Sequence, residues 1–337
     1  MIFSQDIGID LGTTNTLVCI KNKGIVIREP SVVAVDVKSV PQRVVAIGEE
    51  ARQMIGRTPG SITAVKPVRD SVIADFDITV DMLRSVIKKS AGGTLFGRAR
   101  VLIAIPSNVT EVERRAVHDA AKTAGARYVS LIDAPMAAAI GAGLPVAEAV
   151  GSMIIDIGGG SSEVAVISLG DIVASRSTKV AGDKFDEAIV QYIKKTFNLL
   201  IGERTAEDIK IKIGSASPYE GEGAMSIKGR NLTDGLPNTI EVTSGDIREA
   251  LADPLDQVLE TIRSTLEKTP PELSADILEG GITLTGGGAM LRGLDRLIAS
   301  STGMPVKVAE KPLDCIVTGT AICLQKNTTN IRSKDYA

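Results

Sequence analysis

Apolar residues in this chain follow two different periodicities. Short runs rich in Ile and Val indicate strands, and longer stretches with an apolar residue every three or four positions indicate helices. Residues 72–89 show the helical pattern, in which one face carries Met82, Leu83, Val86 and Ile87. Because strand and helix patterns alternate along the sequence, an α/β fold is predicted.

The two periodicities divide most of the chain into elements. Strands are expected at residues 25–27, 31–35, 44–47, 100–106 and 128–132, and helices at 110–125, 135–143, 183–197, 205–215 and 244–268. Thr110 and Glu113 form a capping box at the start of the helix at 110–125. Pro254 predicts a kink or break in the helix at 244–268. Residues 217–242 are polar and weakly patterned, which is typical of a peripheral insertion.

Two stretches carry nearly the same pattern. Residues 6–15 (DIGIDLGTTN) and 154–163 (IIDIGGGSSE) each place one Asp in an apolar run, followed by a turn of Gly and hydroxyl residues. An apolar run resumes after each turn, at 17–20 and at 164–167. Each stretch therefore predicts a β-hairpin with an acidic residue beside its tip. The repeat predicts two related domains around one phosphorylated ligand.

The chemistry of these turns suits phosphate. Consecutive backbone N–H groups in a glycine-rich turn bind phosphate oxygens, and further donors come from the hydroxyl groups of Thr13, Thr14, Ser161 and Ser162. Asp10 and Asp156 lie at strand ends beside the turns. Because carboxylates repel phosphate unless a cation lies between them, the pair implies Mg²⁺, held in part through water.

The glycine turns have three other interpretations: a plain turn, a Walker A motif and a dinucleotide-binding motif. A single Asp-x-Gly-x-Gly pattern is most often only a turn, but two matched copies and a third glycine run at 281–290 favour a ligand site. The sequence contains no Walker A motif. Gly286, Gly287 and Gly288 do not fit the dinucleotide-binding spacing, because Leu291 stands where its last Gly is required.

The composition fits a protein of two domains. The chain has 337 residues, of which 44% are hydrophobic and 23% charged. Its net charge of −3 argues against general nucleic-acid binding. Cys19, Cys315 and Cys323 lie in separate apolar runs, which indicates buried free thiols. His118, the only histidine, is expected on a solvated helix surface, so a zinc site is disfavoured.

Two patterns bear on membranes. The N-terminal residues MIFSQD lack the basic and apolar regions of a signal peptide. The longest weakly polar segment, 136–150, is interrupted by glycines, Pro145 and Glu148, and it is too short to span a bilayer. We therefore expect a cytosolic protein.

The motifs above resemble those of one family. Over essentially the whole chain, the sequence is similar to the MreB/Mbl family of bacterial actin homologues, within the actin, Hsp70 and sugar-kinase superfamily. The stretches that carry this resemblance are 9–15, 23–31, 156–160, 201–207, 269–274 and 284–291. We therefore expect no additional substrate domain of the kind found in Hsp70.

The resemblance implies an actin-like ATPase fold, a duplicated ribonuclease H-like arrangement around a nucleotide cleft. Each of two domains carries a smaller peripheral subdomain. The implied boundaries are 1–32, 66–145 and 318–337 for subdomain IA, 33–65 for IB, 146–180 and 246–317 for IIA, and 181–245 for IIB.

The resemblance also implies a site for ATP and Mg²⁺. The two hairpin turns would grip the phosphates through Gly12, Thr13, Thr14, Asn15, Gly158, Gly159, Gly160 and Ser161. Asp10 and Asp156 would hold the metal through water. Glu207 and Lys210 would flank the adenosine, and base and ribose would pack against Gly286, Gly287, Gly288 and Ala289. From the residues alone, a solvated i,i+3 ion pair is the preferred interpretation of Glu207 and Lys210.

One position departs from the family. Members usually read Glu-Glu-Pro before the Ala-rich helix, and the second Glu positions or activates the attacking water. Here the sequence is Asp133-Ala134-Pro135. General-base assistance is worth about 10²–10⁴-fold in rate, so hydrolysis is expected to be slow unless Asp133 substitutes. Asp133 and Asp156 are the remaining catalytic candidates.

A short loop offers a membrane contact. Leu95 and Phe96 lie between glycines, with basic residues on both sides. Without the family resemblance, a capped core contact explains this pair at least as well. The resemblance favours insertion into the inner leaflet, where the two side chains would contribute roughly 3–6 kcal/mol at most. Filaments that present many such loops would bind more tightly.

The expected function is that of an ATP-binding cytoskeletal protein that sets cell shape. The resemblance implies filaments of paired protofilaments at the inner face of the cytoplasmic membrane, where they organise cell-wall synthesis. It implies membrane-spanning cell-wall elongation proteins as partners, and no nucleic acid. A small-molecule kinase or a stand-alone chaperone-type ATPase on the same fold is the alternative.

Overall fold

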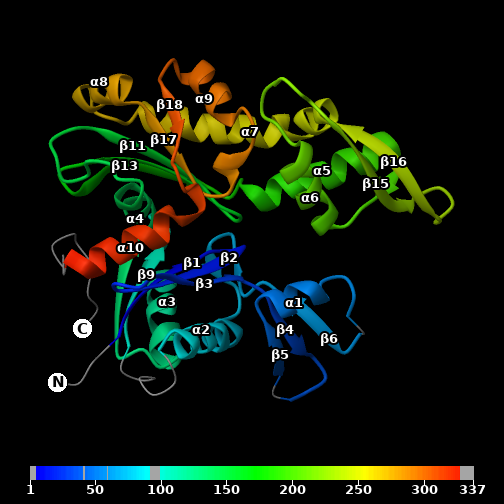
Figure 1. Cartoon of the computed structure of the whole chain (residues 1–337), viewed down its shortest axis with the longest axis horizontal. Coiled ribbons are helices and arrows are strands. Elements are labelled where there is room, and N and C mark those ends of the chain that lie inside the picture. Colours follow the sequence, from blue (N-terminus) through cyan, green and yellow to red (C-terminus); the bar gives the residue numbers. More distant parts are fainter. Residues whose placement is uncertain (1–4, 41, 59, 92–98, 327–337) are drawn as a thin grey trace.

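The structure is a computed structural model that describes residues 5–40, 42–58, 60–91 and 99–326. Two halves lie one above the other in Figure 1, and each is built around a five-stranded sheet. Leu95 and Phe96 lie outside the described residues, as does the chain after Lys326.

The two sheets repeat one topology. The first has the order β10-β9-β1-β2-β3, with β1 Asp6–Leu11, β2 Asn15–Ile20, β3 Gly24–Pro30, β9 Arg100–Ile105 and β10 Tyr128–Asp133. The second has the order β18-β17-β11-β12-β13, with β11 Ser152–Ile157, β12 Ser162–Ser168, β13 Asp171–Thr178, β17 Ile282–Thr285 and β18 Val306–Val308. In each sheet the hairpin and its third strand are antiparallel, and the other two strands run parallel to the first hairpin strand. The two predicted hairpins are therefore confirmed, as equivalent parts of a duplicated sheet.

Small peripheral sheets lie at the right of both halves in Figure 1. The lower one has the order β5-β4-β6, from β4 Val33–Asp36, β5 Arg43–Ile47 and β6 Ile62–Val65, with helix α1 Glu49–Met54. The upper one has the order β14-β15-β16, from β14 Leu199–Leu200, β15 Ala224–Asn231 and β16 Pro237–Thr243. Residues 217–242, expected as a weakly patterned insertion, thus contribute an ordered hairpin.

Helices cover both faces of each large sheet. In the lower half they are α2 Phe76–Ala91 and α3 Glu111–Thr123, and in the upper half α7 Ser244–Leu266, α8 Pro271–Gly280 and α9 Leu294–Thr302. Helices α5 Gly182–Phe197 and α6 Glu203–Ile213 instead pack on α7 and beside the peripheral sheet β14-β15-β16. Helices α4 Ala134–Gly141 and α10 Cys315–Lys326 lie between the sheets. Alternation along a strand produces this layering. In β9, Val101 and Ile103 belong to the core with α2 and α3, whereas Leu102 and Ala104 pack in the layer of α4 and α10.

Helices α4 and α10 approach each other through glycine. A Cβ atom added to Gly141 would overlap the carbonyl oxygen of Cys315, and one added to Gly319 would overlap that of Ala137. Backbone therefore meets backbone where the two helices cross, at the junction of the halves. Both Gly141 and Gly319 belong to helices, so their small size, and not an unusual φ, is what this contact requires.

Most predicted elements are present, and one helix begins later than predicted. Residues 72–73 form strand β8 with β7 Val68–Arg69, and α2 begins only at Phe76, because Asp75 accepts a hydrogen bond from the Ile78 N–H at 3.0 Å and acts as its cap. The capping box of Thr110 and Glu113 is confirmed.

Two predictions about single residues fail. Helix α7 continues unbroken through Pro254, which is buried, so the predicted break is wrong; a proline removes only one hydrogen bond of a helix held by its packed face. His118 is mostly buried, with 14% of its side chain exposed, and its Nδ1 lies 3.2 Å from Asp119 Oδ1. The three cysteines are buried and free, as expected.

Candidate functional site

The tips of the two predicted hairpins meet across the junction of the halves. A side chain on Gly159 would overlap Thr14, and one on Gly160 would overlap Thr13. Ser71 joins both tips, because its N–H donates to Thr13 Oγ1 at 3.1 Å and its hydroxyl lies 2.7 Å from Ser161 Oγ. Glycine is required here because the two turns pack directly against each other.

A cavity of about 540 Å³ opens beside these turns. Its volume lies within the usual range for small-molecule sites. Of the residues singled out from the sequence, those that line it are Asp10, Gly12, Thr13, Thr14, Asn15, Asp156, Gly158, Gly159, Gly160, Ser161, Glu207, Lys210, Gly286, Gly287 and Gly288. The fold thus brings both hairpins, the third glycine turn and helix α6 to one cavity.

Two predicted site residues are not among those lining the cavity. Ala289 is buried in the core of the upper half. Asp133 forms an ion pair with Arg114 of α3, at 3.3 Å between Oδ1 and Nη2. Ala134, by contrast, does line the cavity. Whether Asp133 substitutes for the missing glutamate stays a prediction.

Asp10 and Asp156 are short of compensating positive charge. The pKa of Asp10 is raised to about 8, mainly by burial and in part by the nearby negative charge of Asp156. Burial raises the pKa of Asp156 to about 6, although the Thr285 hydroxyl donates to it at 2.9 Å and opposes the shift. A divalent cation between phosphate and these carboxylates would relieve both shifts, so the pair fits Mg²⁺. The described residues contain no cluster of three or more His, Cys, Asp or Glu side chains suited to holding a metal.

Asp10→Asn should stabilise the protein at pH 8. Because the folded-state pKa of Asp10 is raised above its ordinary value of 3.8 to about 8, ionisation destabilises the fold increasingly as pH rises between these values, and this cost is absent at low pH. We expect a gain of at least about 1 kcal/mol in the free energy of unfolding at pH 8, and little gain at pH 4.5.

Urea denaturation at both pH values, in a metal chelator, measures this gain. The matched control is Asp256→Asn, on the exposed face of α7. An equal effect of Asp10→Asn at the two pH values would contradict the assignment of its pKa.

Glu163 is a cavity residue that the motif analysis missed. It lies on β12 directly opposite Asp156 of β11, and it is 4% exposed. Burial raises its pKa to about 7, against hydrogen bonds from Ser107 that lower it. Its position seven residues after Asp156 would have identified it only if the register of the hairpin had been known. In the first hairpin the equivalent partner of Asp10 is Leu17.

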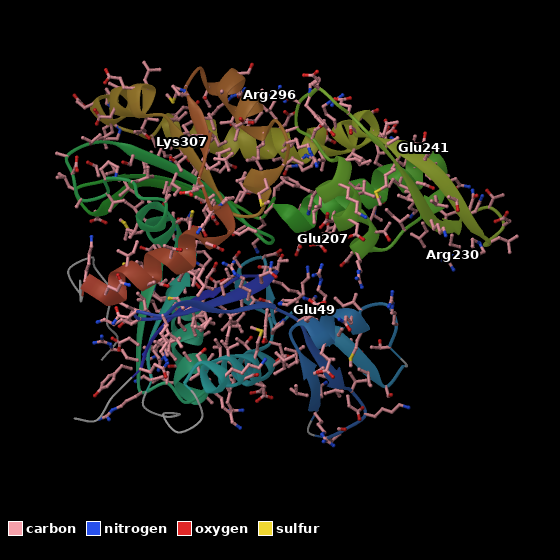
Figure 2. All side chains as sticks on the ribbon, viewed as in Figure 1. Glu49, Glu207, Arg230, Glu241, Arg296 and Lys307 are labelled. Carbon is pink, nitrogen blue, oxygen red and sulfur yellow. The ribbon has the colours of Figure 1, made fainter. Side chains whose placement is uncertain are left out.

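Lys210 and Glu207 each pair with a different element. Lys210 Nζ lies 2.8 Å from Asp186 Oδ1 and donates to the Gly182 carbonyl at 3.0 Å. Glu207 instead pairs with Arg52 of α1, at 3.3 Å across the gap between the halves. Figure 2 shows Glu207 on the upper half facing the lower half, where Glu49 lies. Glu207 and Lys210 therefore each pair with another residue, and the solvated ion pair between them is not observed in the described part of the chain.

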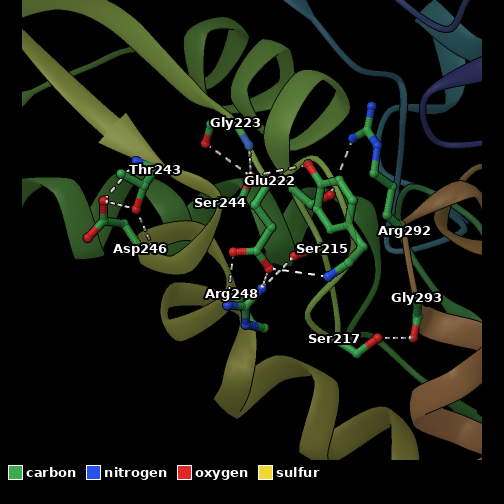
Figure 3. A network of polar contacts seen from close by, with 12 residues as sticks. Ser215, Ser217, Glu222, Gly223, Thr243, Ser244, Asp246, Arg248, Arg292 and Gly293 are labelled. Atoms are coloured by element: carbon green, nitrogen blue, oxygen red, sulfur yellow. Dashed lines mark hydrogen bonds and ion pairs between the residues drawn. The ribbon is translucent and has the colours of Figure 1, made fainter.

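Arg292, also missed from the sequence, joins the third glycine turn to helix α6. It lines the cavity, and its guanidinium donates to the Ile211 carbonyl at 3.1 Å near the C-terminal end of α6. The guanidinium also lies over the ring of Tyr219, 5.7 Å from its centroid. Figure 3 shows Arg292 beside the network of Ser215, Glu222 and Arg248. This network anchors the segment after α6 on α7.

Comparison with known proteins identifies the family of this chain. A family model described as MreB/Mbl protein matches residues 4–332. The chain belongs to the MreB/Mbl family. The cell shape-determining protein Mbl of Bacillus subtilis is 51% identical over 323 residues, which are 96% of each chain.

Solved structures agree with this membership. The crystal structure of MreB 5 of Spiroplasma citri bound to AMPPNP matches with a TM-score of 0.93 and 40% identity, covering 97% of this chain and 98% of that one. A MamK double helical filament matches with a TM-score of 0.80 and 19% identity, covering 96% and 99%. The fold of this MreB/Mbl member is therefore actin-like. Among its described residues, no helix is long and apolar enough to cross a membrane.

Proposed function

We propose that this protein binds ATP with Mg²⁺ in the cavity between its halves and that the bound nucleotide controls assembly into filaments. The observation that carries the proposal is the meeting of both Asp-containing hairpins and the third glycine turn at one cavity of nucleotide size. The AMPPNP bound to the Spiroplasma citri relative supports the choice of nucleotide.

Each wall of the cavity has one task in this proposal. The hairpin turns bind the phosphates, and Asp10 and Asp156 hold Mg²⁺ through water. When bound, the metal neutralises charge on the phosphates. The adenosine lies between α6, with Glu207 and Lys210, and the third glycine turn. The four subdomains implied by the sequence remain part of the proposal, with the cleft between them.

Glu163 is the side chain we propose as the general base. It lines the cavity, and its pKa of about 7 leaves a substantial deprotonated fraction near neutral pH. Asp156 is the other acidic side chain of this hairpin, but its place beside Thr285 suits metal binding. Asp133, paired with Arg114, is not needed.

Ala134→Glu should increase the rate of ATP hydrolysis by at least about 10-fold. Ala134 lines the cavity at the position where the resemblance places the water-activating Glu, so a carboxylate there adds general-base assistance. Phosphate release by the wild-type and variant proteins, at equal filament content, measures the change. Wild-type turnover as fast as that of the variant would show that the missing Glu does not limit the reaction.

The biological role follows from the family. We infer that filaments, with paired protofilaments, lie at the inner face of the cytoplasmic membrane and work with membrane-spanning cell-wall elongation proteins to set cell shape. The name of the cell shape-determining protein Mbl supports the role in cell shape, and the MamK filament supports self-assembly in this fold. Leu95 and Phe96 remain the proposed membrane contact. ATP hydrolysis is the activity that we propose to accompany assembly.

Electron microscopy of the purified chain with ATP, Mg²⁺ and lipid vesicles tests the proposal. We expect filaments on the vesicles with ATP, and few with Asp156→Asn under the same conditions. Absence of filaments across nucleotide and salt conditions, together with phosphoryl transfer to a sugar, would favour the alternative of a small-molecule kinase.

A further inference from the structure

Ser107 reaches the proposed base from the opposite half of the molecule. It follows strand β9 of the first sheet, whereas Glu163 lies on β12 of the second. The Ser107 N–H donates to Glu163 Oε2 at 3.0 Å, and its hydroxyl donates to the same oxygen at 3.1 Å. Ser107 itself is not among the residues that line the cavity. Any contribution of Ser107 to the reaction must therefore act through Glu163.

Two donors on one oxygen fix the orientation of a carboxylate. Both contacts engage Oε2, and among the described residues no hydrogen bond to Glu163 Oε1 is present. The carboxylate is thereby held by one oxygen, which leaves the other to interact with a water in the cavity. A base is effective only when it lies within hydrogen-bond reach of the proton that it takes.

Ser107 is itself held on a rigid support. Pro106 immediately precedes it and restricts the turn, and Thr110, three residues later, is the N-cap of α3 with a complete capping box. Strand β9 is paired on both sides, with β1 and β10. Ser107 therefore moves together with the lower half as a whole.

We propose that Ser107 is a positioning residue that orients the Glu163 carboxylate for catalysis when the two halves are together. This inference rests on the proposed function, in which Glu163 is the base. Separation of the halves removes both donors at once, because both belong to a residue of the lower half. ATP hydrolysis is thus confined to the conformer in which this contact is made.

The same turn supplies a matched control. Asn108, the next residue, also bonds across the junction, from Nδ2 to Ser177 Oγ at 3.2 Å, but this contact is exposed and lies outside the cavity. If Ser107 only strengthened the contact between halves, loss of either side chain would have a similar effect. If Ser107 orients Glu163, only its own loss slows the reaction.

Single-turnover ATP hydrolysis and ATP affinity are measured for Ser107→Ala, Ser107→Thr and Asn108→Ala. We expect Ser107→Ala to slow hydrolysis roughly 10-fold, since one of two charge-assisted hydrogen bonds is lost, with ATP affinity within about twofold of wild type. Ser107→Thr retains a hydroxyl and should restore most of the rate. Asn108→Ala should hydrolyse ATP as wild type does.

A double-variant cycle separates this inference from the proposed function. In a Glu163→Gln background, Ser107→Ala should cause no further loss, because its effect acts through the carboxylate. An equal loss in both backgrounds, or an equal loss in Asn108→Ala, overturns the positioning role. Normal hydrolysis by Ser107→Ala beside slow hydrolysis by Glu163→Gln overturns the role of Ser107 alone. Normal hydrolysis by Glu163→Gln overturns the assignment of the base itself.

Discussion

Glu163→Gln should lower the rate of ATP hydrolysis by about 10²–10⁴-fold and leave ATP affinity nearly unchanged. The amide keeps the size of the side chain but cannot take a proton from water. Glu163 is buried beside Asp156 in the cavity wall, so its replacement also removes one of several clustered negative charges. Affinity for ATP should therefore not fall.

The pH dependence of the wild-type rate provides a second test. Because burial raises the pKa of Glu163 to about 7, the deprotonated, active fraction falls as pH decreases through 7. We expect the single-turnover rate to decline about 10-fold for each pH unit below about 6.5, as for one titrating base. The residual rate of Glu163→Gln should lack this dependence.

The control for both measurements is Glu187→Gln, a carboxylate of α5 paired with Lys184 and located outside the cavity. It should match the wild-type rate at every pH. A Glu163→Gln variant that keeps more than about a tenth of the wild-type rate would contradict the proposed base.

Gly319→Ala and Gly141→Ala should each destabilise the protein by about 3 kcal/mol or more. The added Cβ atoms would overlap backbone carbonyl oxygens, of Ala137 and Cys315 respectively. A side chain can change rotamer, but a helix backbone can move only as a unit, so helices α4 and α10 must separate. Overpacking typically costs about 1–3 kcal/mol, and contacts with backbone lie at its upper end.

Thermal unfolding with and without nucleotide measures this effect. At about 2–4 °C per kcal/mol, the unfolding midpoint should fall by roughly 6 °C or more. Nucleotide should also protect the variants less, because displacement of α4 and α10 alters the junction beside the cavity. Gly280→Ala is the matched control, since a Cβ on this helical glycine of α8 meets nothing within 4 Å. A midpoint for Gly319→Ala within 2 °C of wild type would show that the crossing is not tightly constrained.

Local sequence patterns predicted much of this molecule because they are local physical properties. The twin hairpins, the Thr110 cap and most helices follow from periodicity and turn chemistry over ten to twenty residues. The start of α2 was predicted incorrectly because the Asp75 cap was not recognised. Pro254 was overinterpreted because the packing of α7 outweighs one missing hydrogen bond.

The long-range features could not be predicted in this way. The pairing of Glu163 with Asp156 depends on the register of a hairpin, and one residue of slip would put a different side chain in the cavity. The contact from Ser107 joins residues 56 positions apart in the chain. Likewise, the interaction of Glu207 with Arg52 depends on the relative placement of the halves. The ion pair between Asp133 and Arg114 also joins two separate elements, β10 and α3.

One difference between the duplicated sheets concerns charge: Leu17 is the cross-strand partner of Asp10, whereas Glu163 is that of Asp156. Because of this difference, the two copies of one structural unit have different roles. In the proposed mechanism both copies grip the nucleotide, but only the upper one carries a base. The attacking water is then activated from one side only, so the two nearly equal halves of the clamp are not chemically equivalent.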